Sequence, residues 1–240
     1  MATAGNWLNG FSQSEVGDQV RMRAALVDVD GTLVDTTYLH TVAWWQAMNE
    51  YGHSVAMDRI HRAIGMGADT ILDHLLGSDR DRGDDEAIAD AHSALAAVHW
   101  ASLRPTHGAA DLLRACASRG LRVVLASSAS ERELTALRTA IDADDAIADV
   151  TSADDAEWSK PAPDIVVAAL ERAGARAVDA VFVGDSIWDA HAARKAGVVS
   201  IGVTCGGISR AELASAGMAQ VYVDPDELVA NFDRSPLAAR

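Results

Sequence analysis

Residues 24–33 of the chain read Ala-Ala-Leu-Val-Asp-Val-Asp-Gly-Thr-Leu, and this stretch decides the fold. Its apolar run, residues 24–27, ends at Asp28, which is typical of a strand buried on both faces of a parallel sheet. A turn follows, in which Gly31 lets the backbone come close to a ligand. The stretch therefore predicts a buried strand followed directly by polar residues that could form part of a site.

Two more apolar runs end in the same way. Residues 121–126 lead to Ser127, and residues 180–183 lead to Gly184 and then Asp185. In open parallel sheets, ligands bind outside the carboxyl ends of the strands. We therefore expect the polar residues after these runs to form one site with those after the first strand.

The rest of the chain alternates strand and helix patterns after a break at residues 104–108. This alternation predicts an α/β fold, with a Rossmann-like parallel sheet and helices on both faces. Further strands are predicted at residues 148–150, 198–203 and 221–223, and helices at residues 110–117, 131–139, 164–173, 187–196 and 225–231.

Between the first two strands, residues 37–104 follow a helical pattern, which includes one long helix over residues 86–103. We expect a small α-helical cap domain inserted after the first strand, with hinges at residues 35–37 and 104–108 that let it close. The predicted parts are an N-terminal tail (1–21), a core domain (22–36 and 105–240) and the cap (37–104).

Composition excludes several kinds of partner. The formal net charge of −15 over 240 residues argues against nucleic acid and against an anionic membrane surface. No apolar stretch is long enough to span a bilayer, and residues 1–20 lack the pattern of a secretory signal. Cys116 and Cys205 make no disulfide framework and are expected to be buried fillers, so we predict a cytoplasmic protein. We also expect a monomer. A phosphorylated substrate would need a bound divalent cation to offset the overall charge.

Asp28 and Asp30 are two residues apart, so both point to the same side at the strand end. One carboxylate there can attack phosphorus while the other acts as proton donor and then as base. Taken alone, Asp-Gly is equally consistent with a simple turn. Its combination with a strand before it and Thr32 after it favours catalysis.

The other polar residues have their own alternatives. Asp185 can offer a hard oxygen ligand to Mg²⁺, and Asp189, one helical turn further, can orient a metal-bound water or Lys160. Asp185 or Ser186 can also cap the helix that follows, a role compatible with metal binding. Ser127 can hold a phosphoryl oxygen at a helix N-terminus.

Taken in order, these motifs resemble those of the haloacid dehalogenase superfamily of phosphohydrolases. The chain is most similar to the branch with a small helical cap, which contains phosphoglycolate phosphatase-like and β-phosphoglucomutase-like enzymes, over roughly residues 24–232. The motifs that carry the resemblance are residues 28–33 (Asp-Val-Asp-Gly-Thr-Leu), Ser127, residues 160–164 (Lys-Pro-Ala-Pro-Asp) and residues 184–189 (Gly-Asp-Ser-Ile-Trp-Asp).

The resemblance implies an Mg²⁺-dependent phosphatase that hydrolyses a small phosphorylated metabolite. Asp28 would be the nucleophile, forming an aspartyl-phosphate, and Asp30 the acid and then the base. Ser127 and Lys160 would stabilise the phosphoryl oxygens. The implied metal ligands are the carboxylates of Asp28 and Asp185 and the main-chain carbonyl of Asp30, with Asp189 behind them. Substrate contacts are expected from Gly31, Thr32, Ser128 and His40.

The sequence also bears on related chemistries. Dehalogenases of the superfamily lack the second aspartate, and phosphonate-cleaving members use a cap lysine, whereas residues 37–103 contain no lysine. A β-phosphoglucomutase-like mutase stays an alternative. Two basic residues of that enzyme are missing here, although Arg62 and Arg132 are candidate substitutes. A non-catalytic binding protein on this fold is a third hypothesis.

Specificity is expected to lie in the cap. His40, Trp44, Trp45 and the turn at residues 65–67 are the candidates to face the substrate. Adjacent tryptophans on a helix cannot both point the same way, so we expect one to be packed and the other to lie closer to the cleft.

Overall fold

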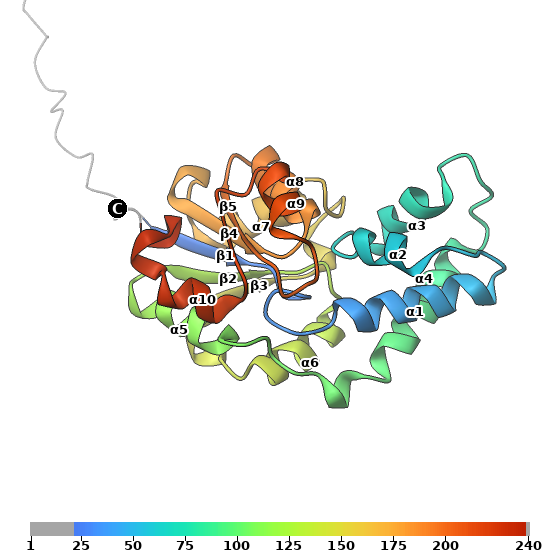
Figure 1. Cartoon of the computed structure of the whole chain (residues 1–240), viewed down its shortest axis with the longest axis horizontal. Helices are drawn as coiled ribbons and strands as arrows, with labels where there is room; N and C mark the ends of the chain where they lie inside the picture. The colour runs from blue at the N-terminus through green and yellow to red at the C-terminus, as the bar shows by residue number, and fades with distance from the viewer. Residues whose placement is uncertain (1–21, 239–240) are drawn as a thin grey trace, which may run out of the picture.

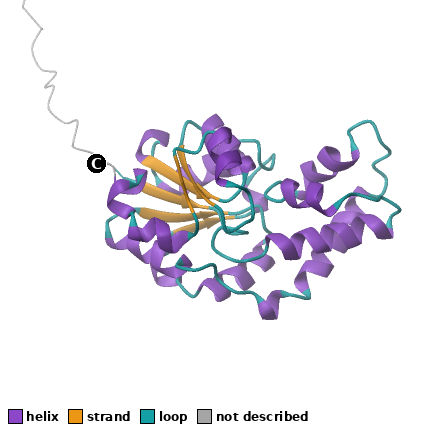
Figure 2. Ribbon diagram, viewed as in Figure 1, coloured by secondary structure: helices purple, strands orange, loops and turns teal. Residues whose placement is uncertain are grey.

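The first predicted strand lies in the middle of a six-stranded parallel sheet with the strand order β3-β2-β1-β4-β5-β6 (Figure 2). This is a computed structural model, and it describes residues 22–238. The predicted tail, residues 1–21, lies outside the described residues. The strands are β1 (Ala24–Val27), β2 (Arg122–Ala126), β3 (Asp149–Thr151), β4 (Ala180–Gly184), β5 (Val199–Val203) and β6 (Gln220–Tyr222).

Successive residues of β1 point into two different hydrophobic cores, because side chains alternate across a strand. Ala25 and Val27 belong to one cluster, and Ala24 and Leu26 belong to the other. Figure 1 shows the helices on both faces of the sheet. One face carries α5 (Ala109–Ser118), α6 (Glu131–Ile141) and α10 (Pro225–Ala230), and the other carries α7 (Asp164–Ala173), α8 (Ile187–Lys195) and α9 (Arg210–Ala216). The predicted fold class is confirmed.

Of the five α-helices between β1 and β2, the first four lie to one side of the sheet in Figure 1, beyond the carboxyl ends of its strands. They have a hydrophobic core of their own, to which Trp44, Met48, Ile60, Ile71 and Ile88 contribute. We propose that they form the cap predicted for residues 37–104. The helices are α1 (Thr37–Glu50), α2 (Met57–Ala63), α3 (Ala68–Leu76) and α4 (Asp85–Ala97).

The two segments that connect these helices to the sheet pair with each other. Val34 and Pro105 form an antiparallel bridge. The Asp35 N–H donates to Arg104 O at 3.0 Å, and the Thr106 N–H donates to Leu33 O at 2.9 Å. The four helices therefore enter and leave the core domain at one place.

The long helix predicted over residues 86–103 is wrong at its C-terminal end. α4 stops at Ala97, and a short 3-10 turn (Trp100–Ser102) follows. Trp100 packs against the core that contains Leu134 and Leu137, so burial of its ring turns the chain away from the helix axis toward the sheet. Among residues 22–238, no helix is long and apolar enough to cross a membrane.

Candidate active site

Three buried carboxylates meet at the carboxyl ends of β1 and β4. Asp28 follows β1, Asp185 follows β4 and Asp189 lies in the first turn of α8. A carboxylate oxygen from each lies within 4.8 Å of the others. The sheet topology alone places Asp28 beside Asp185, because β1 and β4 are neighbouring parallel strands in register.

One lysine lies among these carboxylates. Lys160 Nζ is 2.5 Å from Asp28 Oδ1 and 2.8 Å from Asp189 Oδ1, and its side chain is only 1% exposed. Burial acts to lower the pKa of the ammonium, but the charges of Asp189 and Asp28 outweigh it and raise that pKa. Lys160 is therefore a charged group at neutral pH and belongs to the site, unlike an ordinary surface lysine.

Thr32 lies between two of the carboxylates. Its hydroxyl is 3.1 Å from Asp28 Oδ2 and 3.0 Å from Asp185 Oδ1, and the residue is fully buried. A hydroxyl has one proton to donate, so it serves one carboxylate at a time. Thr32 was predicted to contact substrate. The structure instead places its hydroxyl between the carboxylates, and neither Thr32 nor Gly31 is among the residues that line the cavity described below.

The site has more negative than positive charge. Burial, only partly offset by Lys160, raises the pKa of Asp28 to about 7. Burial, with the charges of Asp28 and Asp189, raises the pKa of Asp185 well above its ordinary value. Like charges this close and this buried are stable together only with protons or with a cation. The donor set of carboxylate oxygens suits a hard divalent cation such as Mg²⁺.

The surroundings of Asp185 Oδ2 also fit a bound ion. Within residues 22–238 this oxygen accepts no hydrogen bond, whereas both oxygens of Asp189 are engaged, Oδ1 with Lys160 and Oδ2 with Ser186. A side chain at Gly31 would collide with Asp185 Oδ2 and with Thr37 Oγ1, a buried hydroxyl without a hydrogen-bond partner among these residues. These two oxygens without a hydrogen-bond partner among residues 22–238 fit the chemistry of a hard cation and its waters.

The backbone of Gly206 packs closely against the same oxygen, which gives a test. A Cβ at this position would collide with Asp185 Oδ2 and lie 2.5 Å from its Cγ. In Gly206→Ala we therefore expect the affinity for Mg²⁺ to fall about 10- to 100-fold, as when a ligand's support is disturbed. Calorimetric titration of the metal-free protein with Mg²⁺ measures this. Gly83→Ala, in an exposed loop where a Cβ makes only a 3.4 Å contact, is the matched control. Equal affinities in the two variants would contradict the assignment.

Asp30 faces a different set of partners. Its Oδ1 accepts from Thr36 Oγ1 at 2.8 Å and lies 3.3 Å from His40 Nε2, which is also 3.6 Å from Glu133 Oε1. Burial acts to raise the pKa of Asp30, but hydrogen bonds from His40 and Thr36 hold it below its ordinary value. Burial lowers the pKa of His40, yet Asp30 and Glu133 raise it on balance. The raised pKa favours protonation of His40, and a protonated imidazole here would pair with the ionised Asp30.

His40 continues into a row of rings. Its Nδ1 is 3.1 Å from His92 Nε2, and the His92 ring stacks on Trp44 at 4.0 Å between centroids. Burial and the charge of His40 lower the pKa of His92 well below its ordinary value, so His92 is the neutral member. Of the tryptophan pair, Trp44 is both packed and at the cavity, whereas Trp45 is 39% exposed and outside its lining. The expectation that the two roles would be divided between them is therefore wrong.

Ser127 follows β2 and is fully buried, and its Oγ accepts from the Ala129 N–H at 3.0 Å. Its own proton is left to donate. The next three residues line the cavity, and Ser130 caps α6 by accepting from the Glu133 N–H. On the other side, Ser186 caps α8 in a reciprocal arrangement with Asp189. The helix-capping alternative thus applies to Ser186 and not to Asp185.

A cavity of about 400 Å³ lies between Asp28 and Asp30 on one side and the proposed cap helices α1, α3 and α4 on the other. It brings together Asp28, Asp30, Lys160, Ser128 and His40 from the sequence-based predictions, with no lining contribution from Ser127, Asp185 or Asp189. Sequence reasoning missed Asp69, His92, Glu133 and Glu157, which also line it. Cys205 was expected to be a buried filler. It is partly exposed, and its Sγ lies 3.2 Å from Gly31 O, beside the site.

A family model described as haloacid dehalogenase-like hydrolase matches residues 22–197, which is most of the chain. The chain belongs to the haloacid dehalogenase-like hydrolases. The matched region contains all of the carboxylates and the lysine described above, so the family and the geometry refer to the same residues. The predictions of this superfamily and of a hydrolase are confirmed.

The chain is also similar to individual proteins and solved structures. The phosphoglycolate phosphatase of Rhodospirillum rubrum is 31% identical over 214 residues, covering 84% of this chain and 87% of that protein. The crystal structure of a hydrolase from Pseudomonas syringae, 30% identical, matches with a TM-score of 0.84 over 89% of this chain and 99% of that chain. β-Phosphoglucomutase from Clostridium difficile matches with a TM-score of 0.77 over 90% of this chain and 97% of that one. At 17% identity, it shows the fold alone.

Proposed function

We propose that this haloacid dehalogenase-like hydrolase is an Mg²⁺-dependent phosphatase that hydrolyses a small phosphorylated metabolite through an aspartyl-phosphate on Asp28. The observation that carries the proposal is the arrangement of Asp28 between Lys160 and Thr32 at the base of the cavity, with Asp30 on its wall. The relatives named phosphoglycolate phosphatase support phosphate-ester hydrolysis as the reaction class.

In the first half of the reaction, a carboxylate oxygen of Asp28 attacks the phosphorus atom and the bond from phosphorus to the leaving oxygen breaks. The leaving oxygen receives a proton by way of Asp30. Because Asp30 is ionised in the arrangement described above, it first takes this proton from the protonated imidazole of His40, 3.3 Å away, and then passes it on. Lys160 offsets the charge on the phosphoryl oxygens, and the Ser127 hydroxyl donates a hydrogen bond to one of them.

In the second half, the ionised Asp30 takes a proton from a water molecule, whose oxygen attacks the same phosphorus. The bond between Asp28 and phosphorus breaks, which releases inorganic phosphate and returns the proton to Asp30. Mg²⁺ held by Asp28, Asp185 and the main-chain carbonyl of Asp30 would neutralise charge on the transferred group. Asp189 keeps Lys160 and the start of α8 in place.

The mutase alternative gains no support from the cavity. A mutase has to hold a second phosphate, and both candidate arginines are engaged elsewhere. Arg62 is paired with Glu212, and the Arg132 guanidinium lies 5.2 Å from the centre of the Trp100 ring. Neither is among the residues that line the cavity.

The test is hydrolysis of a panel of phosphorylated sugars, polyols and acids by the full chain. We expect release of inorganic phosphate that is lost in EDTA and restored by Mg²⁺. Phosphorus NMR on a hexose 1-phosphate separates the alternatives, since a mutase yields an isomeric sugar phosphate and a phosphatase does not. Full turnover after exhaustive metal removal would contradict the proposal.

A further inference from the structure

The cavity lacks a free positive charge. Within residues 22–238, Lys160 is the only lysine or arginine that lines it. Its ammonium is buried and lies between Asp28 and Asp189 at 2.5 and 2.8 Å. It is therefore committed to the nucleophile and the transferred phosphoryl group, and is not free to bind the rest of a substrate.

The two histidines do not supply this charge either. The charge of His40 is offset by Asp30 at 3.3 Å, with Glu133 Oε1 at 3.6 Å. His92 is neutral, since burial and the neighbouring His40 lower its pKa well below the ordinary value. A carboxylate or a second phosphate on the substrate would thus find no unpaired cation.

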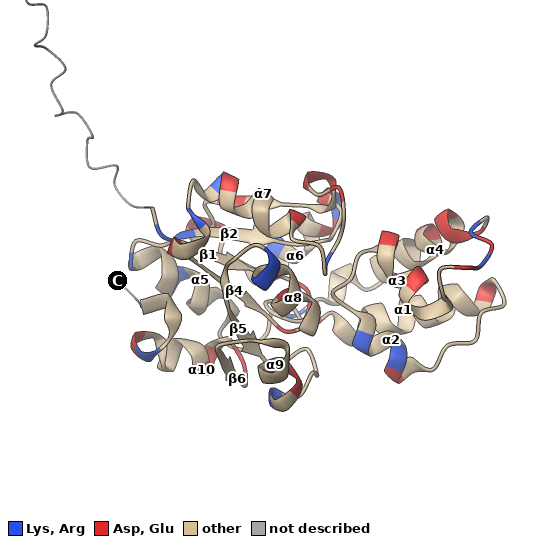
Figure 3. Cartoon of the chain, turned by 90° about the horizontal axis from the view of Figure 1, so that it is seen from above, with Lys and Arg blue, Asp and Glu red and all other residues tan. Residues whose placement is uncertain are grey.

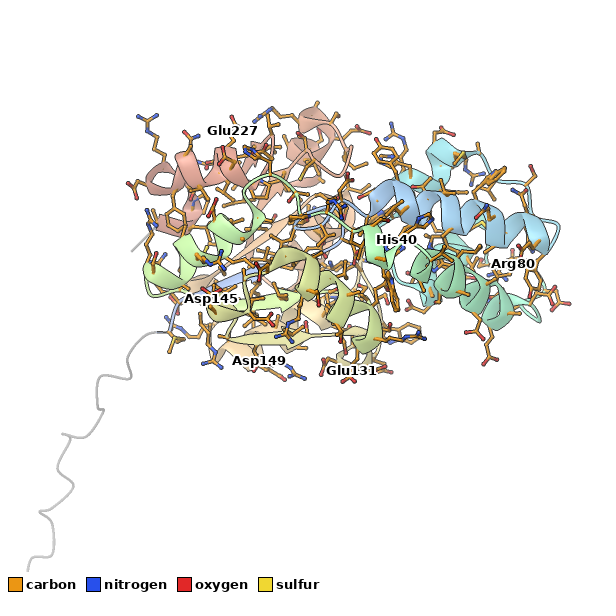
Figure 4. All side chains as sticks on the ribbon, turned by 90° about the horizontal axis from the view of Figure 1, so that it is seen from below. His40, Arg80, Glu131, Asp145, Asp149 and Glu227 are labelled. Carbon is orange, nitrogen blue, oxygen red and sulfur yellow. The ribbon has the colours of Figure 1, made fainter. Side chains whose placement is uncertain are left out.

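The arginines of the four proposed cap helices and their loops do not line the cavity. They are at α2 and in the loop before α4, and Figure 3 shows no blue on α1 or α4. Arg62 is paired with Glu212 across to α9. Arg80 pairs with Asp73 and Asp85 and lies at the end of these helices that is far from His40 (Figure 4).

The entrance of the cavity is negative instead. Asp69 and Glu157 both line it and both are exposed. The remaining polar lining consists mainly of uncharged hydroxyls, on Ser93, Ser128 and Ser159. Negative groups at an entrance repel an incoming anion, and like charges facing each other reject the wrong partner.

We infer that the substrate is a phosphomonoester whose leaving alcohol is hydroxylated and carries no negative charge. This inference rests on the proposed phosphatase function and narrows it. The phosphoryl group is the only anionic part that the cavity can neutralise, through Lys160 and the metal. The rest of the substrate is held by hydroxyl-to-hydroxyl and hydroxyl-to-carboxylate hydrogen bonds. The cavity differs in this respect from one built for a phosphorylated acid.

Two matched pairs of esters test the inference. 2-Hydroxyethyl phosphate and 2-phosphoglycolate differ only in CH₂OH against carboxylate, and sn-glycerol 1-phosphate and 3-phospho-D-glycerate, which share one configuration at C2, differ in the same way. We expect kcat/KM to be about tenfold or more higher for the uncharged member of each pair, which corresponds to about 1.4 kcal/mol. Equal values, or a preference for the carboxylates, overturn the inference. Absence of Mg²⁺-dependent hydrolysis of any ester in the panel overturns the proposed function instead.

A charge change at the entrance tests the cause. In Glu157→Lys, the ratio of kcat/KM for sn-glycerol 1-phosphate to that for 3-phospho-D-glycerate should fall about three- to tenfold at low ionic strength and less at high salt. Glu171→Lys makes the same charge change on an exposed position of α7, outside the lining, and should leave the ratio unchanged. An unchanged ratio in Glu157→Lys, or an equal fall in both variants, overturns the assignment of selectivity to this cavity.

Discussion

Replacement of Asp28 by asparagine should abolish turnover while leaving the fold intact. The amide cannot attack phosphorus, so kcat should fall by about 10⁴-fold or more, the scale seen when a catalytic nucleophile is removed. The variant should also melt no lower than the parent in the absence of metal. The reason is that burial raises the pKa of Asp28 to about 7, so ionising this carboxyl group lowers the stability of the folded protein.

Steady-state kinetics and thermal melting in EDTA measure the two effects. Asp111→Asn, the same change at an exposed position in the first turn of α5, should leave both unchanged. Measurable turnover by a correctly folded Asp28→Asn would reject the nucleophile assignment.

In Asp30→Asn, the phosphoenzyme should accumulate because water is not activated, and mass spectrometry of acid-quenched protein should find one added phosphoryl group.

Replacement of Lys160 by methionine should damage both activity and stability. Loss of the ammonium removes a donor to the transferred oxygens, and kcat should fall about 10²- to 10³-fold. It also leaves the buried Asp28 and Asp189 without their partner at 2.5 and 2.8 Å. Breaking a buried ion pair from one side costs about 3–5 kcal/mol, so the free energy of unfolding should fall by this order, less what proton uptake recovers.

The pH range of this effect follows from the sign of the pKa shift. The pKa of Lys160 is raised in the folded protein, so its contribution is complete at neutral pH and is lost only as the pH rises through that raised value. Urea unfolding at pH 7 in EDTA measures the loss. The chain has one other lysine, Lys195, which is exposed and donates to Pro161 O at 2.8 Å, and Lys195→Met is the control. Equal unfolding free energies in the two variants would contradict the structural role of Lys160.

The sheet could be predicted because its signals are local. Each of β1, β2 and β4 is a short apolar run, and the residue after it is polar. Parallel pairing then brings Asp28 and Asp185 together without further information, since neighbouring strands end at the same edge. Local sequence did not predict the place of Lys160 in the site, because a single lysine in a loop usually lies in solvent. Only its place in the ordered series of motifs pointed to the buried position that the structure shows.

Residues whose roles depend on packing between distant helices could not be predicted. Glu133 lies in the first turn of α6, where an acidic residue is commonplace. His92 is a single histidine inside an Ala-rich helix, with no motif around it. Both become part of the site only because α4 and α6 approach His40 from two sides. Gly206 carries no signal of its own either, since the need for a missing side chain appears only with Asp185 beside it.

The pairing of the two connecting segments at Val34 and Pro105 has a consequence for how such a protein can change over time. The inserted helices have their own core and meet the sheet domain through neighbouring entry and exit points. An insertion of another length or shape can therefore be accepted there without displacing β1 or the carboxylates that follow it. Selection can therefore vary the inserted helices while leaving Asp28 and Asp30 untouched.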